Sequence, residues 1–199
     1  MSAATALIDC VRTGCLGTYV VFTMQRSAST TLCDDLNMWH ANCTYELLNG
    51  GEKNAGAHWS QRLGVSPSLM HSHPSWFVDT VRKALHRPPV FGFKLFPHHP
   101  FSASHVTPTT TCVVLRRRNV TAQFVSTKIA QTRDCWDTHG ASRCHDATYK
   151  VDAKELAAFA RACAAWFAKV ERFCAGARTT LHVTTEAYLH ERAALFRAE

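Results

Sequence analysis

A run of small hydroxylated residues around one arginine has the chemistry of an anion site. The run is Gln25-Arg-Ser-Ala-Ser-Thr-Thr31, between a predicted strand and a predicted helix. A phosphate or sulfate at the start of a helix meets unpaired backbone N–H groups and the positive end of the helix dipole, and the arginine adds a permanent charge. The motif Gly-x-x-x-x-Gly-Lys-Ser/Thr is absent, which disfavours a kinase or an NTPase. A plain Ser/Thr-rich helix cap is the alternative interpretation.

A second polar run follows another predicted strand. Arg116, Arg117 and Arg118 come directly after Thr111–Leu115, and Ser126 lies eight residues beyond the last arginine. Eight residues are slightly more than two helical turns, so Arg118 and Ser126 can face one ligand if the arginine extends from the start of the helix. In isolation, the run is equally typical of a solvated basic turn.

Alternating strands and helices must position these two runs. Short β-branched and aromatic runs predict strands at 18–23, 89–96, 111–115 and 179–184. Apolar residues at helical spacing predict helices at 32–39, 74–85, 120–132, 152–174 and 186–197. Ser72 or Ser75 could cap the second of these helices, and Asp152 with Glu155 makes a capping-box-like pair for the fourth. Turn-forming composition predicts loops at 49–61, 98–110 and 133–150.

The alternation predicts a single α/β domain over residues 1–199. Its architecture would be three layers, α/β/α, with a central, mainly parallel sheet covered by helices on both faces. Sheets of this kind bind ligands at the carboxyl ends of their strands. Both polar runs follow such ends, and the first would form a P-loop-like cradle for a phosphate or a sulfate.

The two runs, in this order, resemble the sulfotransferase family, which transfers sulfonate from 3′-phosphoadenosine 5′-phosphosulfate (PAPS). The nearest resemblance is to bacterial-type carbohydrate sulfotransferases, such as the trehalose 2-sulfotransferases. Their first loop is similar to Arg26-Ser-Ala-Ser-Thr30 and their second to Arg117-Arg-Asn-Val-Thr-Ala-Gln-Phe-Val-Ser126. Phe91-Gly-Phe-Lys-Leu95 and residues 122–132 are also similar to that group. The resemblance covers residues 18 to 190.

The resemblance implies how the donor is held. The 5′-phosphosulfate would be bound by the first loop, that is by Arg26, Ser27, Ala28, Ser29, Thr30 and Thr31. The 3′-phosphate, which distinguishes this donor from ATP, would be bound by Arg118 and Ser126. The product would be adenosine 3′,5′-bisphosphate (PAP), and no metal is implied.

Transfer to a hydroxyl acceptor also needs a base that removes its proton. In the carbohydrate group a glutamate shortly after the first helix has this role, and Glu46 matches its place. His98 and His99 are rivals, because they follow the strand at 89–96 and histidine titrates near neutral pH. Lys94 could contact the sulfonate if its side chain faces the cleft. Arg26 would meet the charge that develops on the leaving phosphate.

Two features of the chain depart from the family. Position 28 is alanine where the family usually has glycine, which is strained if φ must be positive. The chain of 199 residues is also short for the family. A catalytically inactive nucleotide-binding or interaction protein with the same fold is therefore the alternative. A nucleic-acid binder is disfavoured, because the aromatic residues do not alternate with the basic ones as stacking platforms would.

Charge and hydropathy define the expected partners and compartment. The net charge of +7 favours anionic partners, among which composition alone does not choose. With the resemblance, we expect a hydroxyl-bearing small molecule or a glycan as acceptor, and no nucleic-acid partner. No run approaches the ~18 apolar residues that span a bilayer, and residues 1–18 lack the pattern of a signal peptide. We therefore expect a cytoplasmic protein; its oligomeric state is not predicted.

The chain has nine cysteines. Several stand alone among apolar residues and are interpreted as buried free thiols: Cys33, Cys112, Cys163 and Cys174. Cys135 and Cys144 flank a turn-rich stretch, and three interpretations stay open for them: free thiols, a disulfide, or, with His139 and His145, a zinc site.

Overall fold

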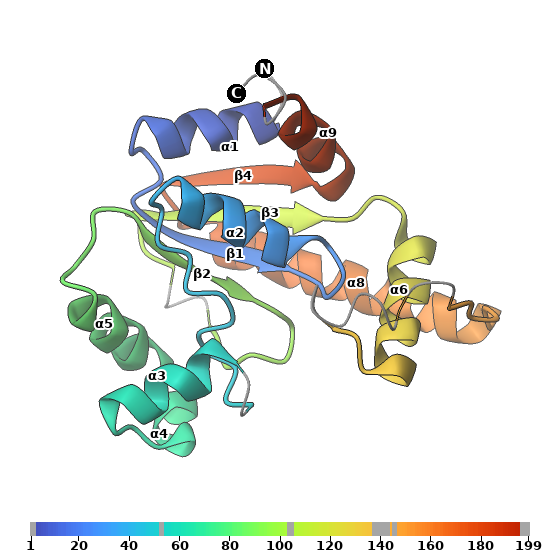
Figure 1. The fold of residues 1–199 in the computed structure, drawn as a ribbon, viewed down its shortest axis with the longest axis horizontal. Helices are drawn as coiled ribbons and strands as arrows, with labels where there is room; N and C mark the ends of the chain where they lie inside the picture. The colour runs from blue at the N-terminus through green and yellow to red at the C-terminus, as the bar shows by residue number, and fades with distance from the viewer. Residues whose placement is uncertain (1–2, 52–53, 103–105, 137–143, 145–146, 196–199) are drawn as a thin grey trace.

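Four parallel strands form the centre of the protein (Figure 1). They are β1 (Thr18–Thr23), β2 (Phe91–Leu95), β3 (Thr110–Arg116) and β4 (Thr179–Thr184), in the order β2-β1-β3-β4. The computed structural model describes residues 3–51, 54–102, 106–136, 144 and 147–195. The predicted α/β class with a parallel sheet is confirmed. Because all strands run the same way, the loops after β1 and β3 leave the sheet at the same end.

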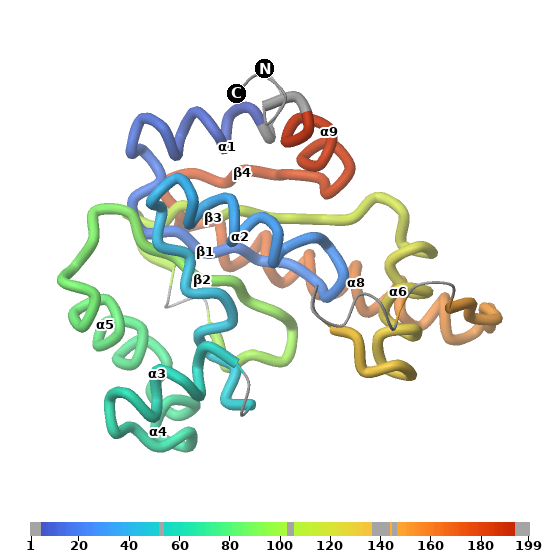
Figure 2. Tube along the Cα trace, viewed as in Figure 1, coloured from blue at the N-terminus to red at the C-terminus, as the bar shows by residue number. Residues whose placement is uncertain are grey.

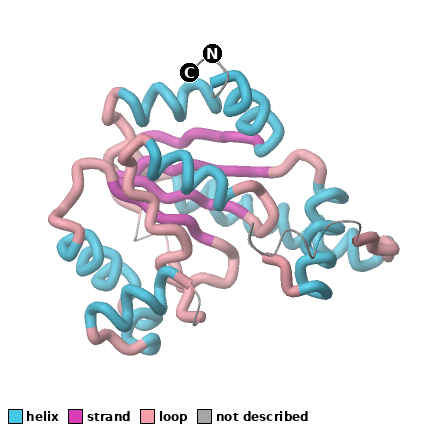
Figure 3. Tube along the Cα trace, in the orientation of Figure 1, coloured by secondary structure: helices cyan, strands magenta, loops and turns pink. Residues whose placement is uncertain are grey.

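Helices cover both faces of this sheet (Figure 3). Alternate residues of β1 separate two cores. The helices are α1 (Ala3–Arg12), α2 (Ser29–Met38), α3 (Ala55–Leu63), α4 (Pro67–Ser72), α5 (Pro74–Ala84), α6 (Val120–Arg133), α8 (Ala153–Cys174) and α9 (Thr185–Leu195). Val20 and Phe22 pack with α8 and with the group α3 to α5, whereas Tyr19 and Val21 pack with α1, α2 and α9. Two layers of helices therefore enclose the sheet, which gives the predicted three-layer α/β/α arrangement.

The differences from the predicted elements have local causes. Helix α3 begins inside the stretch 49–61 that was predicted to be a loop and extends past its end, because Trp59 is buried in the core despite polar neighbours. Helix α5 has neither predicted cap: Ser72 donates its hydroxyl to Ser68 O (2.9 Å), and His73 precedes the helix without a side-chain cap. Asp152 does cap α8, accepting from the N–H groups of residues 154 and 155.

Four disulfides correct the prediction of free thiols. Of the four cysteines expected to be free, only Cys163 is free and buried. For the Cys135–Cys144 pair, the structure selects the disulfide among the three open interpretations; His139 and His145 lie outside the described residues. Cys112 and Cys174 gave no sign of pairing in the sequence, because they lie 62 residues apart and meet only through the tertiary fold. The bonds are Cys10–Cys15, Cys33–Cys43, Cys112–Cys174 and Cys135–Cys144.

Two further findings concern the described part of the chain. None of its helices combines the length and apolarity needed to cross a membrane. Helices α1 and α9 lie side by side (Figure 2), where the hydroxyl of Thr5 donates to Glu191 (2.8 Å). Both helices pack on the face of the sheet that also carries α2.

Candidate functional site

The loop between β1 and α2 turns its carbonyl oxygens into the protein. Each of the five carbonyls of residues 23–27 accepts a hydrogen bond from a side chain of α6, α8, α9 or the loops themselves. The donors are Trp166 Nε1 to Thr23 O (3.0 Å), Ser27 Oγ to Met24 O (2.7 Å), Gln123 Nε2 to Gln25 O (2.7 Å), Arg117 to Arg26 O (3.2 Å) and Thr185 Oγ1 to Ser27 O (2.9 Å). The negative ends of the peptide dipoles therefore point away from the mouth of the loop.

The opposite side of the same loop presents donors. Within the described residues, the backbone N–H groups of residues 26–31 donate to no acceptor. Several of them belong to the first turn of α2, where the helix dipole also favours negative charge. Inward carbonyls and N–H groups without a protein acceptor suit a phosphate or a sulfate, and residues 24–31 are called the anion loop below.

Two residues of the loop have left-handed backbone conformations. Arg26 has φ 62° and Ala28 has φ 56°. Successive residues that change between left- and right-handed conformations direct their N–H groups towards one point, which is the geometry of an anion nest. For an L-residue this conformation costs about 1–2 kcal/mol. The condition under which alanine at position 28 would be strained, a positive φ, is thus met.

The hydroxyls of the loop do not all face the same way. Ser27 is fully buried, and its hydroxyl is used within the protein, donating to Met24 O and accepting from Gln123 (2.9 Å). Ser29 is also buried, whereas Thr30 and Thr31 are half-buried. Thr30 Oγ1 accepts from Lys94 Nζ (2.9 Å), so this hydroxyl faces the side chain of Lys94 on β2.

Arg26 joins the loop to α6. Its Nε donates to Ser126 Oγ (2.8 Å), and a terminal nitrogen donates to Cys135 O (3.3 Å) and Trp136 O (3.1 Å). Burial and then the charge of Arg117 lower the pKa of the Arg26 guanidinium, which nevertheless remains charged. No carboxylate in the described residues pairs with Arg26. The pair of positive charges favours an anion at this place.

The second polar run is arranged differently from its prediction. Arg118 is exposed, and Ser126 bonds to Arg26. The carboxylate of Glu186 accepts from the backbone N–H of Arg118 (3.0 Å) and of Asn119 (3.2 Å). Burial raises the pKa of Glu186, but these hydrogen bonds and Arg117 lower it by more, so the carboxylate stays charged. A 3′-phosphate here would therefore depend on side chains, and the joint role of Arg118 and Ser126 stays a prediction.

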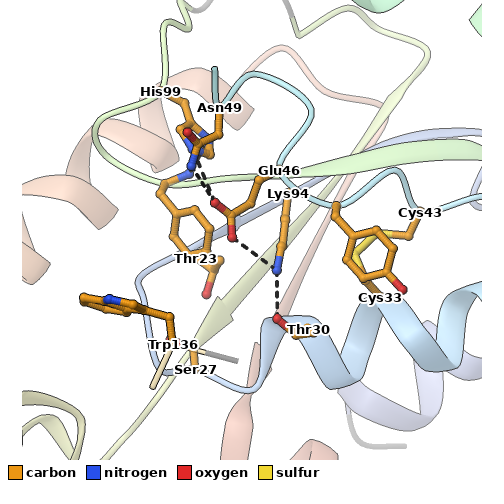
Figure 4. Close-up of polar contacts among 12 residues, drawn as sticks. Thr23, Ser27, Thr30, Cys33, Cys43, Glu46, Asn49, Lys94, His99 and Trp136 are labelled. Atoms are coloured by element: carbon orange, nitrogen blue, oxygen red, sulfur yellow. Dashed lines mark hydrogen bonds and ion pairs between the residues drawn. A yellow bond between two sulfur atoms is a disulfide. The ribbon is translucent and has the colours of Figure 1, made fainter. Parts of the chain in front are cut away.

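A lysine connects the anion loop to the predicted base (Figure 4). Lys94 Nζ lies 2.9 Å from Thr30 Oγ1 and 3.5 Å from Glu46 Oε1. The lysine side chain is only 3% exposed, whereas that of Glu46 is 25% exposed. Burial lowers the pKa of Lys94, and the charge of Glu46 opposes that shift. Lys94 thus connects the carboxylate of Glu46 to Thr30 in the first turn of α2.

The two histidines are less suited than Glu46 to accept a proton from an acceptor hydroxyl. His99 Nδ1 accepts from the backbone N–H of Phe96 (3.3 Å), so the neutral ring carries its proton on Nε2. Burial above all, then the charges of His98, Lys94 and His71, lowers the pKa of His99 to about 3. Its Nε2 is buried without a hydrogen-bond partner in the described residues, 3.9 Å from Glu46 Oε2. His99 has no free lone pair for a proton, and His98 is exposed and stacked on Phe96.

Sequence reasoning missed the partners of Glu46. Asn49 Nδ2 donates to Glu46 Oε2 (2.8 Å), so each carboxylate oxygen has its own neighbour. Asn49 lies three residues after the glutamate, in a stretch whose composition predicted only a loop. The Glu-x-x-Asn spacing fits the turn in which the Asn49 N–H donates to Glu46 O (3.0 Å), but spacing alone does not fix the direction of the two side chains.

The site as a whole can bind an anion and remove a proton next to it. The anion loop offers N–H groups and Arg26, and Glu46 offers a carboxylate held by Lys94 and Asn49. Comparisons of the chain with protein-family models, with curated proteins and with solved structures found no match.

Proposed function

We propose that the protein is a sulfotransferase that moves a sulfonate group from PAPS to a hydroxyl acceptor. One observation carries the proposal: Lys94 contacts both Thr30, in the first turn of the anion-binding helix, and the carboxylate of Glu46. A base next to an anion cradle is the arrangement that transfer from an anionic donor to a hydroxyl requires.

In this proposal each residue of the site has its own role in the transfer. Glu46 accepts the proton of the acceptor hydroxyl while its oxygen forms a bond to sulfur. The bond from sulfur to the bridging phosphate oxygen breaks, and its electron pair stays on that oxygen. The N–H groups of residues 26–31 and the guanidinium of Arg26 stabilise this growing charge, and Lys94 neutralises the sulfonate. Arg118 and Ser126 hold the 3′-phosphate.

The nature of the acceptor rests on the resemblance to carbohydrate sulfotransferases. We propose a carbohydrate or a glycolipid hydroxyl, rather than a nucleic acid. The compartment is a separate point. The sequence led us to expect the cytoplasm, but four disulfides are typical of proteins from oxidising compartments. We therefore favour an oxidising compartment for the working protein.

Donor binding can be tested without knowing the acceptor. PAP should raise the melting temperature far more than ATP, AMP or Mg²⁺-ATP, because the second site recognises the 3′-phosphate. A ligand at about 100 times its Kd adds roughly 2.7 kcal/mol to the free energy of unfolding. Equal stabilisation by ATP would contradict the donor assignment.

Turnover then separates an enzyme from an inactive relative. The purified protein is incubated with PAPS and a panel of sugars, glycolipids and other alcohols, and products are screened by mass for an added sulfonate. We expect a sulfated carbohydrate product that Glu46→Gln fails to make. Stabilisation by PAP with no product from any acceptor would favour the catalytically inactive alternative.

A further inference from the structure

The segment that carries Glu46 is held in a strained conformation. Between the end of α2 and Glu46, three residues other than glycine have positive φ: His40 (58°), Asn42 (48°) and Tyr45 (52°). Such conformations persist only where the surroundings enforce them, and they concentrate at functional sites. The contacts that enforce this one are therefore informative about how the glutamate is placed.

Helix α2 is bonded to the segment at Cys43. The disulfide Cys33–Cys43 joins the two covalently (Figure 4). The side chain of Asn37 binds both polar groups of the Cys43 backbone, accepting from its N–H (2.6 Å) and donating to its carbonyl (3.0 Å). Further along, Tyr45 donates its hydroxyl to Asp34 (2.6 Å). One residue, Cys43, is thus fixed by a covalent bond and two hydrogen bonds from a single helix.

The other side of the segment is fixed to the sheet. Thr44 N–H donates to Gly92 O (2.8 Å), and Lys94 N–H donates to Tyr45 O (2.8 Å). Lys94 therefore meets this segment twice, through its backbone and through the ion pair with Glu46. Between α2 and β2, the segment has little freedom to slide.

The contacts that fix Cys43 come from α2, the same helix whose first turn belongs to the anion loop. Ser29, Cys33 and Asn37 follow at intervals of four residues, so they lie along one stripe of α2. The first turn offers its N–H groups to the anion, and the next two turns hold Cys43. A rigid helix rises about 1.5 Å per residue, so it sets the separation between the two sites.

We propose that the Cys33–Cys43 disulfide and Asn37 are positioning residues that set the place of Glu46 relative to the anion loop. This inference rests on the proposed function for the role of Glu46 as base, but its structural part does not. Without the disulfide, the strained segment would relax, and the carboxylate would leave the position from which it reaches the acceptor hydroxyl. Donor binding would persist, because the N–H groups of α2 are unchanged.

The experiment compares two disulfide deletions. C33S/C43S removes the proposed positioning bond, whose cysteines are 10 residues apart, and C10S/C15S removes another local bond, of separation 5, at the end of α1 and outside the site. Asn37→Ala is the second variant in case C33S/C43S folds poorly. For each protein we measure kcat, the donor KM, PAP affinity, and hydrogen exchange of the Thr44 and Lys94 amides. Peptide mapping without reduction first confirms the Cys33–Cys43 bond in the wild type.

Expected results split kcat from donor binding. A misplacement of about 1 Å can cost about 100-fold in rate, so kcat of C33S/C43S should fall roughly 10- to 100-fold. Its donor KM and PAP affinity should stay within about twofold, and both amides should exchange faster. Asn37→Ala should show a milder form of the same pattern, and C10S/C15S should match the wild type.

Several outcomes would overturn the inference. They are unlinked Cys33 and Cys43 in the native protein, unchanged kcat and exchange in C33S/C43S and Asn37→Ala, or a parallel loss of kcat and PAP affinity, which indicates general unfolding. If the wild type makes no product, the proposed function fails. Faster exchange confined to the segment would then still support the structural part, and unchanged exchange would refute it.

Discussion

Replacing Ala28 with glycine should stabilise the protein. The residue has φ 56° and ψ 24°, a left-handed conformation that costs an L-residue about 1–2 kcal/mol. Glycine avoids this cost but loses more entropy on folding, by about 0.4–1 kcal/mol. The net gain in the free energy of unfolding is therefore about 0.5–1 kcal/mol. Most alanine-to-glycine changes have the opposite sign.

The gain translates into a small but measurable shift. Unfolding entropy of about 2.1 cal/mol/K per residue, over 199 residues, gives about 0.4 kcal/mol/K. The melting temperature should therefore rise by about 1–2 °C in calorimetry. Ala157→Gly is the matched control: this exposed position lies in the right-handed interior of α8, where glycine should destabilise by about 1 kcal/mol.

The two variants must differ in sign. If Ala28→Gly lowers the melting temperature as Ala157→Gly does, Ala28 is not left-handed in the folded protein. The geometry of the anion loop described above would then be wrong. A rise for Ala28→Gly that persists in saturating PAP would show that the donor-bound loop keeps the same conformation.

Three further predictions concern the site. Glu46→Gln should lower kcat by about 10²–10⁴ with nearly unchanged PAP affinity; steady-state rates and calorimetric titration check this, and full activity would reject Glu46 as base. Arg118→Ala should raise the donor KM about ten- to more than a hundredfold, and Arg26→Ala should also depress kcat. If Arg118→Ala discriminates against a donor without the 3′-phosphate as strongly as the wild type does, Arg118 does not bind that phosphate. His99 takes up a proton below about pH 6.5 when unfolded but only near pH 3 when folded, so stability falls as pH decreases through that range. His99→Asn should lessen the loss between pH 7 and 5 by about 2 kcal/mol in urea unfolding, and an identical loss would place His99 in water.

Features with local causes could be predicted from the sequence. The strands at 18–23 and 179–184 are confirmed at their predicted bounds, because short β-branched runs favour the extended conformation through their residue types alone. The sequence identified position 28 as strained on the condition that its φ is positive, and the structure meets that condition. The helix spacing after residue 120 was also sufficient, and α6 follows it closely.

Features that depend on distant partners could not be predicted. The sequence suggested that Ser126 faces a ligand together with Arg118, whereas in the structure Ser126 Oγ accepts from Arg26 Nε. This contact could not be predicted, because the loops that carry the two residues meet only when β1 and β3 pair. The tautomer of His99 depends on one backbone N–H group three residues away. The contact of Lys94 with Glu46 requires the segment before the glutamate to lie along β2, which no spacing reveals.

The Cys112–Cys174 bond changes how the chain is connected. It joins the central strand β3 to the last residue of α8 and closes a ring over a sequence separation of 62 residues. Closing such a ring is worth about 4 kcal/mol in the chain-entropy model. A single peptide-bond cleavage within the ring therefore leaves two fragments that stay covalently joined. Because Cys135–Cys144 lies inside it, a cut between those two cysteines is bridged twice. A nicked protein would run as one species without reductant and as two with it.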